Sequence, residues 1–487
     1  MRGFHAAGAV LALVPIVLAG CVSYGILHAE KAATPPMGNP PGPDPWDPWY
    51  GDPGPVGPRP GGPRGGGPGG GPAFRGRIVA APAPYGIVTY FAALYLQQGG
   101  QRTLSGQAYS TDRTDTSAVV VIGAGALAME GVTVRTGGSS TSTDASFLYG
   151  LDAAVLALSG STIRMTGGSI STKGSGASGA FANGDGSLVA LEGLAVDCAG
   201  PYARAAMAAR GGKLRLRDVV LRAAGEDGAA VATGMGGGTV DMEGGSLLAD
   251  GLGSPGIVSM GDVYVDGAKV RATRAEAVVI DGAGSVALRG TDLSSARDGR
   301  WGVLIHRSTS DGTEAEGRFS MTGGSLRLEA ADGPLFRVAN ASADISLSGV
   351  GLSVGSGTLL RAAAGTWGRS GANGGSAVVH ASGQSLRGDF TADGLSALSL
   401  TLIEGSSLEG AVNPDGKARA AGLVLGADSS WKVGADSWLT TLGLSDGKAG
   451  LSRIEGGGHA VRYRAASNPW LEGRSYGLAG GGTLSPY

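Results

Sequence analysis

The sequence predicts an all-β protein, a right-handed single-stranded parallel β-helix, and three observations lead to that prediction. One phrase recurs along the chain, with apolar residues four and two positions before a turn residue and three positions after it. The copies follow one another at nearly constant steps. Glycine makes up 92 of the 487 residues, without the strict three-residue period of collagen. A repeat this short buries its apolar side only by stacking on its neighbours.

The phrase is clearest in four copies between residues 163 and 247, which read IRMTGGSI, VALEGLAV, LRLRDVVL and VDMEGGSL. Their turn residues are Gly167, Gly193, Asp218 and Gly244, at steps of 26, 25 and 26 residues. Further copies turn at Gly131, Gly267, Gly290, Gly323 and Gly349, and fainter ones at Gly383 and Gly405. In the last of these, Ile403 and Leu408 are expected to point inward.

Each repeat offers material for three short strands. Apolar residues at offsets of minus four and minus two lie on one face of a strand. The odd step to plus three indicates a bend at the turn residue, which re-aims the next strand. A third apolar run, such as AAVAT at Ala229, lies between phrases. We therefore expect about a dozen stacked coils. A leucine-rich repeat is excluded because its motif is missing, and the period is too short for a propeller blade.

Two steps are longer than the others, those that end at Gly167 and Gly323. They contain the segments TGGSSTSTDASFLYG and ARDGRWGVLIHRSTSDG, which we interpret as inserted loops. Insertions in solenoids gather on one face, which is often the binding face. These loops are therefore candidates for contact with a ligand, although variation in loop length explains them as well.

The chain divides into four regions. Residues 1–20 are predicted to be a lipoprotein-type signal peptide, and residues 21–85 a lipid anchor followed by a Pro/Gly-rich disordered stalk. Residues 86–455 form the β-helix, and residues 456–487 a carboxyl-terminal cap or tail. The apolar stretch YGIVTYFAALYLQQ near the start of the β-helix is expected to cap the first coil, as a strand pair or a short helix.

The amino terminus has the features of a targeting segment. Arg2 supplies a positive charge, and Ala6–Ala19 is apolar but short for a membrane span. The segment ends in Leu-Ala-Gly-Cys21, which resembles the lipobox of bacterial lipoproteins. That resemblance implies lipidation of Cys21, export, and attachment to the cell envelope, at the outer membrane or the cell surface. The alternative is an ordinary signal peptide that contains a cysteine.

Cysteine and charge content argue against a disulfide, a nucleophilic cysteine and a nucleic-acid partner. With Cys21 acylated, Cys198 has no partner for a disulfide, and we interpret it as a small core residue rather than a nucleophile. Charged residues make up 16% of the chain and the net charge is −2. No basic face dominates, so a nucleic-acid partner is not expected. We expect a monomer.

From about residue 99 to residue 487, some four-fifths of the chain, the sequence resembles a bacterial group of β-helix surface proteins of the pectin-lyase-like fold class. The resemblance lies in phrases such as DTSAVVV, GTLLRAAAGTWG, LTLIEGSSLEGAVN and SSWKVGADSWLTTL. A looser similarity is to the passenger rods of pertactin-like autotransporters, which carry a carboxyl-terminal membrane barrel. We expect no barrel here, and expect the lipid at Cys21 to supply the attachment. No catalytic residue can be transferred from the closer group.

Catalytic chemistry finds little support. Glycoside hydrolysis needs paired carboxylates at a defined separation, and no such pair stands out. The five histidines are scattered, without metal-ligand or triad spacing. We therefore predict no catalytic, cofactor-binding or metal-binding residues and no cofactor. The RGD triplet Arg387-Gly388-Asp389 suggests integrin binding, but we interpret it as part of a Leu-x-Gly-Asp-apolar turn.

The residue just before each turn should line up with its counterparts on neighbouring coils, about 5 Å apart. These residues are Glu130, Thr166, Glu192, Arg217, Glu243, Asp266, Arg289, Thr322 and Ser348. The row is interpreted either as an acidic groove for Ca²⁺ or an anionic glycan, or as a solvated ladder of weak ion pairs. The intervening arginines argue against a carboxylate-only metal site.

Three functions follow from these observations. The first is a lipid-anchored, non-catalytic surface rod that acts as an adhesin or in cell-envelope interaction, with a glycan or extracellular-matrix ligand. The second is a polysaccharide lyase or hydrolase of the pectin-lyase-like class. It would need a cluster of Asp, Glu, Arg and Lys from adjacent coils, which the sequence does not reveal. The third is a structural spacer without a ligand.

Overall fold

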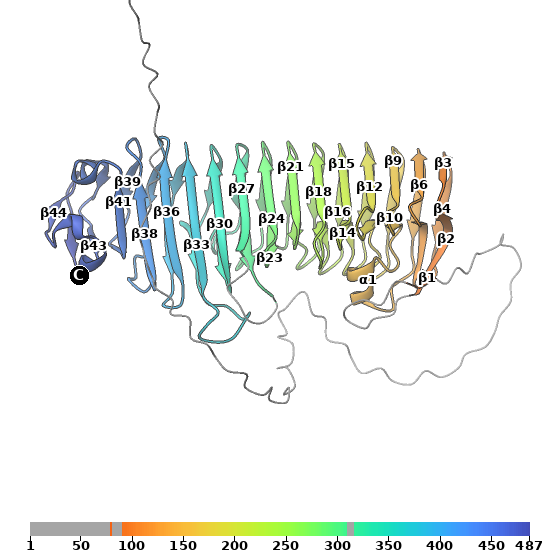
Figure 1. Ribbon diagram of the computed structural model, residues 1–487, viewed down its shortest axis with the longest axis horizontal. Helices are drawn as coiled ribbons and strands as arrows, with labels where there is room; N and C mark the ends of the chain where they lie inside the picture. The colour runs from red at the N-terminus through yellow and green to blue at the C-terminus, as the bar shows by residue number, and fades with distance from the viewer. Residues whose placement is uncertain (1–77, 80–89, 309–315) are drawn as a thin grey trace, which may run out of the picture. The chain divides into compact units, whose positions relative to one another are not determined.

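The computed structural model describes residues 78–79, 90–308 and 316–487, and within these ranges the chain is a parallel β-solenoid (Figure 1). The predicted all-β, parallel β-helix fold is confirmed. The right-handed sense of coiling stays a prediction. The predicted signal peptide, Cys21 and nearly all of the predicted stalk lie outside the described residues.

One coil illustrates the rest. It runs through β11 (Ala180–Asn183), β12 (Leu188–Glu192) and β13 (Ala195–Cys198), and the next coil repeats this with β14 (Arg204–Ala209), β15 (Lys213–Arg217) and β16 (Val220–Ala223). Each strand pairs in parallel with the strand three places on, so three sheets run along the solenoid. Each coil therefore adds one strand to each of the three sheets, as the three predicted strands per repeat require.

The three sheets contain 13, 14 and 10 strands. The 14-stranded sheet runs from β3 (Gln101–Ser105) to β41 (Thr441–Leu444), which is slightly more than the dozen coils expected. The 13-stranded sheet begins at β1 (Ile78–Val79) and ends at β35 (Asp389–Ala392). The 10-stranded sheet ends at β31 (Gly351–Val354), and a four-stranded sheet that starts at β34 (Ser385–Arg387) follows it in the chain.

The turn residue of the sequence pattern lies in the tight turn that leads from the 14-stranded sheet to the 10-stranded sheet or, at Gly383 and Gly405, to the four-stranded sheet that follows it. Every turn residue predicted from the phrase has a positive φ, between 50° at Asp218 and 74° at Gly405. At Gly167 a Cβ would meet nothing within 4 Å, so glycine serves the backbone angle there and Asp can replace it at the equivalent position 218. At the next residue, Gly168, a Cβ would lie 2.0 Å from the carbonyl oxygen of Val132. The two glycines of MTGGS are therefore needed for different reasons, Gly167 for its backbone angle and Gly168 for the close approach of the neighbouring coil.

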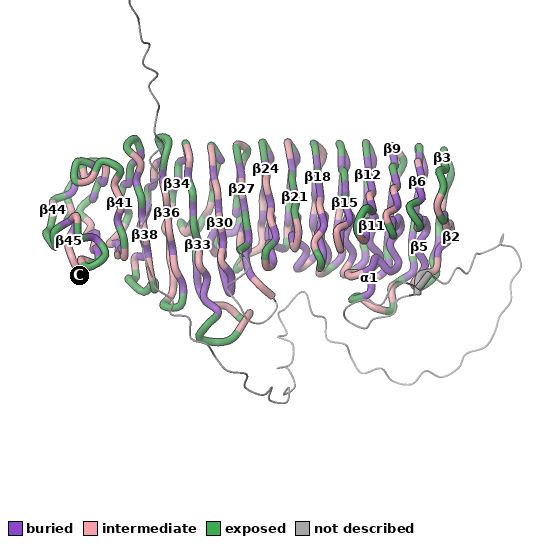
Figure 2. Tube along the Cα trace, in the orientation of Figure 1, coloured by how far each residue is buried: buried purple, intermediate pink, exposed green. Residues whose placement is uncertain are grey.

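The core lies between the sheets and is built from the inward residues of the phrase (Figure 2). Ile163, Met165 and Ile170 of one coil are at most 1% exposed, and their counterparts stack above and below them. Ile403 is a wrong prediction, because it is 42% exposed while Leu402 is buried. The turn there contains an additional residue, Glu404, with positive φ, which shifts the inward positions by one.

The two ends differ in part from the prediction. The described part of the apolar stretch before the first coil is a single strand, β2 (Tyr90–Gln98), rather than a strand pair or a short helix, and β1 pairs with it in antiparallel fashion. β1 lies among the residues predicted to form the stalk, and both of its residues, Ile78 and Val79, are β-branched. At the other end, β40 (Ser437–Leu439), β43 (Ala460–Tyr463), β45 (Thr483–Pro486) and β44 (Tyr476–Gly477) form a separate small sheet.

The long insertion before Gly167 is not a plain loop. It contains helix α1 (Thr143–Tyr149), capped by the Ser142 hydroxyl, which accepts from the Ala145 amide, and closed by Gly150 at φ 78°. Three short 3₁₀ helices lie in the last coils: η1 (Gly447–Arg453), η2 (Ala465–Ser467) and η3 (Pro469–Leu471). Part of the second insertion, around residues 309–315, lies outside the described residues.

Candidate functional site

The outer face of the 14-stranded sheet carries a groove of about 730 Å³. It crosses seven consecutive strands: β9 (Thr162–Thr166), β12, β15, β18 (Thr239–Glu243), β21 (Asp262–Asp266), β24 (Ser285–Arg289) and β27 (Glu316–Thr322). We call it the charged groove. Its outward side chains are Arg164, Thr166, Ala190, Glu192, Arg215, Arg217, Asp241, Glu243, Tyr264, Asp266, Ala287, Arg289, Ser320 and Thr322.

Alternation along the strands places these side chains outside. In β15 the pattern is exposed, buried, exposed, buried, exposed, so Lys213, Arg215 and Arg217 point outward while Leu214 and Leu216 fill the core. Strand pairing aligns Arg217 with Glu192 on one side and with Glu243 on the other. The row predicted from the sequence, from Glu130 to Ser348, is therefore confirmed as a continuous line of paired positions.

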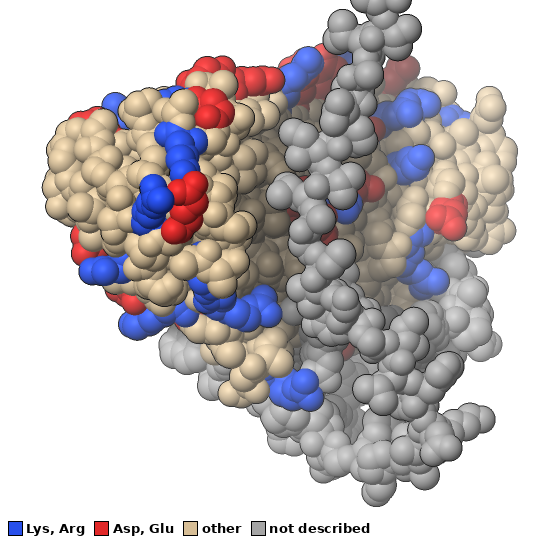
Figure 3. All heavy atoms as spheres, turned by 60° about the vertical axis from the view of Figure 1, so that its left-hand side comes forward, with Lys and Arg blue, Asp and Glu red and all other residues tan. Residues whose placement is uncertain are grey.

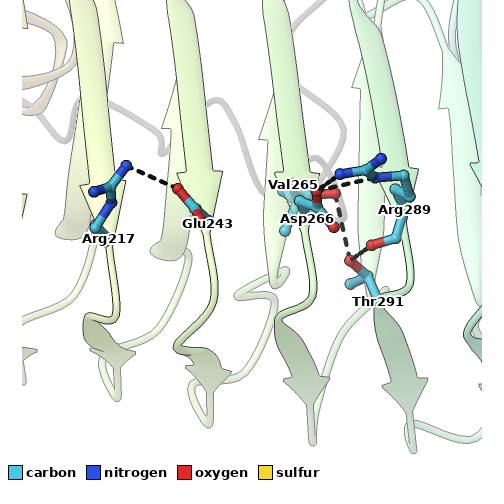
Figure 4. A network of polar contacts seen from close by, with 6 residues as sticks. All are labelled: Arg217, Glu243, Val265, Asp266, Arg289 and Thr291. Atoms are coloured by element: carbon cyan, nitrogen blue, oxygen red, sulfur yellow. Dashed lines mark hydrogen bonds and ion pairs between the residues drawn. The ribbon is translucent and has the colours of Figure 1, made fainter.

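Two ion pairs link neighbouring strands within this row (Figure 4). Arg217 donates to Glu243 at 2.9 Å, and Arg289 donates to Asp266. The hydrogen bond to Asp266 raises the pKa of the Arg289 guanidinium. The Thr291 hydroxyl donates to the Arg289 carbonyl at 2.9 Å. The side chains of Arg217 and Glu243 are 61% and 68% exposed, so the pair contributes little to stability.

The same arrangement bears on the metal interpretation of the row. Arginines interrupt the carboxylates, and the described residues contain no group of three His, Cys, Asp or Glu side chains placed to hold a metal ion. For the Arg217 and Arg289 positions the solvated-ladder interpretation fits better than an acidic Ca²⁺ groove. In a space-filling view from the carboxyl-terminal end, basic and acidic side chains lie next to one another (Figure 3).

Sequence reasoning missed the second outward row, three residues before each turn. It runs through Arg164, Ala190, Arg215, Asp241 and Tyr264 on successive paired strands. Together the two rows form a cluster of Asp, Glu and Arg from adjacent coils, which the sequence analysis did not find. The outward letters of LRLR and VDME contain this second row as well as the first.

The outer face of the 13-stranded sheet is different in kind. Its outward row is apolar and at most 4% exposed, and its members lie on paired strands from β5 (Thr116–Ile122) to β26 (Val303–His306). They are Val120, Leu156, Phe181, Met207, Ala232, Val258, Val279 and Leu304. Helix α1 packs on this row with Phe147, and Trp301 and Trp367 pack on it further along.

Both predicted contact loops contribute to that cover. The Asn183 amide of β11 donates to the Leu148 carbonyl of α1 at 3.0 Å, and the Arg204 guanidinium lies 4.9 Å from the centre of the Phe147 ring. Trp301, from the second insertion, packs edge-on against Trp367 with ring centres 6.3 Å apart. The described parts of these insertions thus pack on the chain's own sheet.

Cys198 and the described histidines have different surroundings. Cys198 is fully buried, burial raises the pKa of its thiol to about 12, and it has no disulfide partner among the described residues. A thiol with that pKa is a poor nucleophile, in agreement with a core role. His306 is buried against Trp367, whereas His380 and His459 lie at the surface near Asp344 and Asp436 respectively.

The RGD triplet joins two strands: Arg387 ends β34, and Asp389 begins β35. The Asp389 carboxylate accepts from the Ala411 amide at 2.7 Å, so it joins one coil to the next. A Cβ at Gly388, whose φ is 127°, would lie 2.5 Å from the Gly357 carbonyl oxygen. Arg387 points to solvent near Glu409. Gly388 and Asp389 thus have structural roles, as expected for a Leu-x-Gly-Asp turn.

The lipidation residue Cys21 lies outside the described residues. None of the described helices is long and apolar enough to cross a membrane. No protein-family model matches the sequence, and no curated protein matches it either.

Proposed function

We propose that the chain is a non-catalytic β-helix rod of the bacterial cell envelope, an adhesin or cell-envelope interaction protein, which binds polysaccharide in the charged groove. The observation that carries this proposal is the groove itself. It spans seven coils on an exposed sheet face and offers guanidinium donors, carboxylate acceptors and an exposed tyrosine ring. Those are the groups that bind sugar hydroxyls and ring faces.

The cellular address is part of the same proposal. Lipidation at Cys21 after the Leu-Ala-Gly-Cys sequence would hold the rod at the membrane, with the Pro/Gly-rich segment as a spacer. The three-sheeted parallel coil supports membership of the pectin-lyase-like fold class, and the groove supports a surface role like that of the β-helix proteins it resembles. An extracellular-matrix ligand remains an alternative to a bacterial glycan.

A polysaccharide lyase or hydrolase is the second candidate, and one observation favours it. Asp241, Glu243 and Asp266 lie in one groove with Arg217 and Arg289, as an enzyme acting on a glycan would need. Against it, Glu243 and Asp266 each form an ion pair with an arginine of the neighbouring strand. A carboxylate held in that way is less available as a proton donor or a nucleophile.

The test is to incubate the full chain with bacterial, plant and animal polysaccharides and to measure retention and product release together. Retention without products would support the binding rod and give its ligand class. Release of shortened or unsaturated sugars would overturn the proposal in favour of the enzyme. Absence of both would contradict glycan binding and favour the structural spacer or a protein partner.

A further inference from the structure

The amino-terminal half of the charged groove differs from the other half in charge. On β9, β12 and β15 the outward charged residues are four basic ones and one acidic one, Arg164, Lys213, Arg215, Arg217 and Glu192. On β18, β21 and β24 they are four acidic ones and one basic one, Asp241, Glu243, Asp262, Asp266 and Arg289. The groove as a whole is close to neutral, but its first three strands carry a surplus of positive charge.

Two arginines in this half flank a small residue. Strand pairing places Arg164 and Arg215 in one row, on either side of Ala190. Adjacent strands are about 4.8 Å apart, so the two arginines leave their strands about 10 Å apart with only a methyl group between them. Two long side chains can close over a group of a few atoms above Ala190. We call this the Arg164–Arg215 site.

The two arginines of this site are not held in ion pairs as others in the groove are, although Asp241 occupies the paired position beside Arg215. Arg217 and Arg289 each form an ion pair with a carboxylate on the next strand. Within the described ranges, no salt bridge involves Arg164, Arg215 or Lys213. Guanidinium groups bind carboxylate, sulfate and phosphate oxygens through paired N–H donors. The site is therefore suited to an anionic group.

The groove extends beyond the site in a way that fits a polymer. Along the same row follow Asp241, an acceptor, and Tyr264, a residue that is 47% exposed, with Ala287 beyond it. An exposed ring on a sheet face can stack against a sugar ring. Because the coils repeat at a regular spacing, a chain of sugar units along the row would meet a new strand at every step.

We infer that the Arg164–Arg215 site binds the carboxylate or sulfate groups of an acidic polysaccharide, whose following sugar units lie along the groove to Tyr264. This inference rests on the proposed function and gives it a ligand class. The acid group would lie over Ala190 between the two guanidinium groups. Lys213, on the same strand as Arg215, adds to the local positive charge.

Retention of the full chain should be measured on dextran, carboxymethyl-dextran and dextran sulfate, which share one backbone, and on alginate and hyaluronan. We expect binding to at least one acidic polymer, little binding to dextran, and weaker binding at high salt. The carboxymethyl and sulfate arms distinguish the two acid groups. Arg164→Gln combined with Arg215→Gln should weaken that binding at least tenfold, and Ala190→Glu should weaken it similarly.

The matched control is Arg327→Gln, an exposed arginine on β28 (Ser325–Leu328) of the 10-stranded sheet, which should bind like the unchanged chain. Unaltered binding by the double variant would overturn the inference, as would equal retention of duplex DNA, which would show unspecific polyanion binding. Binding only to neutral polymers would overturn the inference but leave the proposed function in place. Failure to bind any polysaccharide in the wider panel would overturn both.

Discussion

Two outer faces of the same solenoid have opposite character. The 13-stranded sheet turns an apolar row outward and buries it under α1, Trp301 and Trp367, whereas the 14-stranded sheet turns charged residues outward and leaves them exposed. The backbone ladder and the inward residues follow one rule in both. The comparison teaches that stability resides in the inward rows and the covered face, so that the exposed face is free to carry binding residues.

The largest effect is expected when an aspartate is placed on each of the two faces, on neighbouring strands of one coil. Met207 on β14 is fully buried on the covered face, and Arg215 on β15 is exposed in the charged groove. Met207→Asp should destabilise the fold by about 4 kcal/mol or more, because a buried carboxylate would lack a partner. Arg215→Asp should change stability by less than about 0.5 kcal/mol. Thermal unfolding followed by circular dichroism measures both, and equal losses would contradict the contrast.

A second comparison separates the two glycines of one turn beside the groove. Gly168→Ala would bring a Cβ to 2.0 Å from the Val132 carbonyl oxygen, so we expect a loss of about 3 kcal/mol or more. Gly167→Ala meets open space and suffers only the unfavourable φ of 60°, about 1 kcal/mol. Denaturation midpoints should rank the two variants in that order. The reverse ranking would show that the coils are spaced differently at this turn.

The covered side also contains a buried acid, Asp152, whose carboxylate accepts from the Thr116 amide at 3.1 Å. Burial raises the pKa of this carboxyl from 3.8 to about 8. Between those pH values the folded chain holds a proton that the unfolded chain has lost, so the free energy of unfolding falls as the pH rises from about 4 to about 8.

The variant Asp152→Asn keeps an acceptor for Thr116 and stays neutral at every pH. Its melting temperature should therefore decline less between pH 5 and pH 8 than that of the unchanged chain. Parallel slopes for the two proteins over this range would show that Asp152 does not titrate there.

The smallest effect is expected from the ion pairs of the groove. Glu243→Gln removes the partner of Arg217 at a site where both side chains are more than half exposed. The change in the free energy of unfolding should be below about 1 kcal/mol and smaller still at high salt. A loss of several kcal/mol in urea denaturation would show that the charged face contributes to folding after all.

The fold could be predicted from the sequence because its rule is local and repeated. The turn residues, the inward residues and the row from Glu130 to Ser348 follow from counting, and strand pairing confirms them. The prediction that Ile403 points inward was wrong because the apolar pattern does not reveal the one-residue insertion at Glu404. Helix α1 was not predicted because the seven residues TDASFLY are too few to show a helical period. Its position on the sheet depends on contacts with residues that are distant in sequence.

The candidate site was only half predicted for a related reason. The residue next to each turn is easy to follow, whereas Arg164, Ala190 and Arg215 become one site only when the strand register is known. The covered face also leaves a mark in the sequence. Strands such as RAAMAA and AAVAT are apolar at nearly every position, as expected for strands that are buried on both faces.

The most direct test of the account is residue-resolved arginine labelling of the full chain, with and without the polysaccharide that it retains best. Phenylglyoxal modification, followed by mass spectrometry, reports on each arginine separately. We expect protection of Arg164 and Arg215 by the polysaccharide and unaltered labelling of Arg327 on the neighbouring sheet. Protection spread evenly over the arginines, or confined to another sheet, would contradict the claim that the face of the 14-stranded sheet is the binding surface.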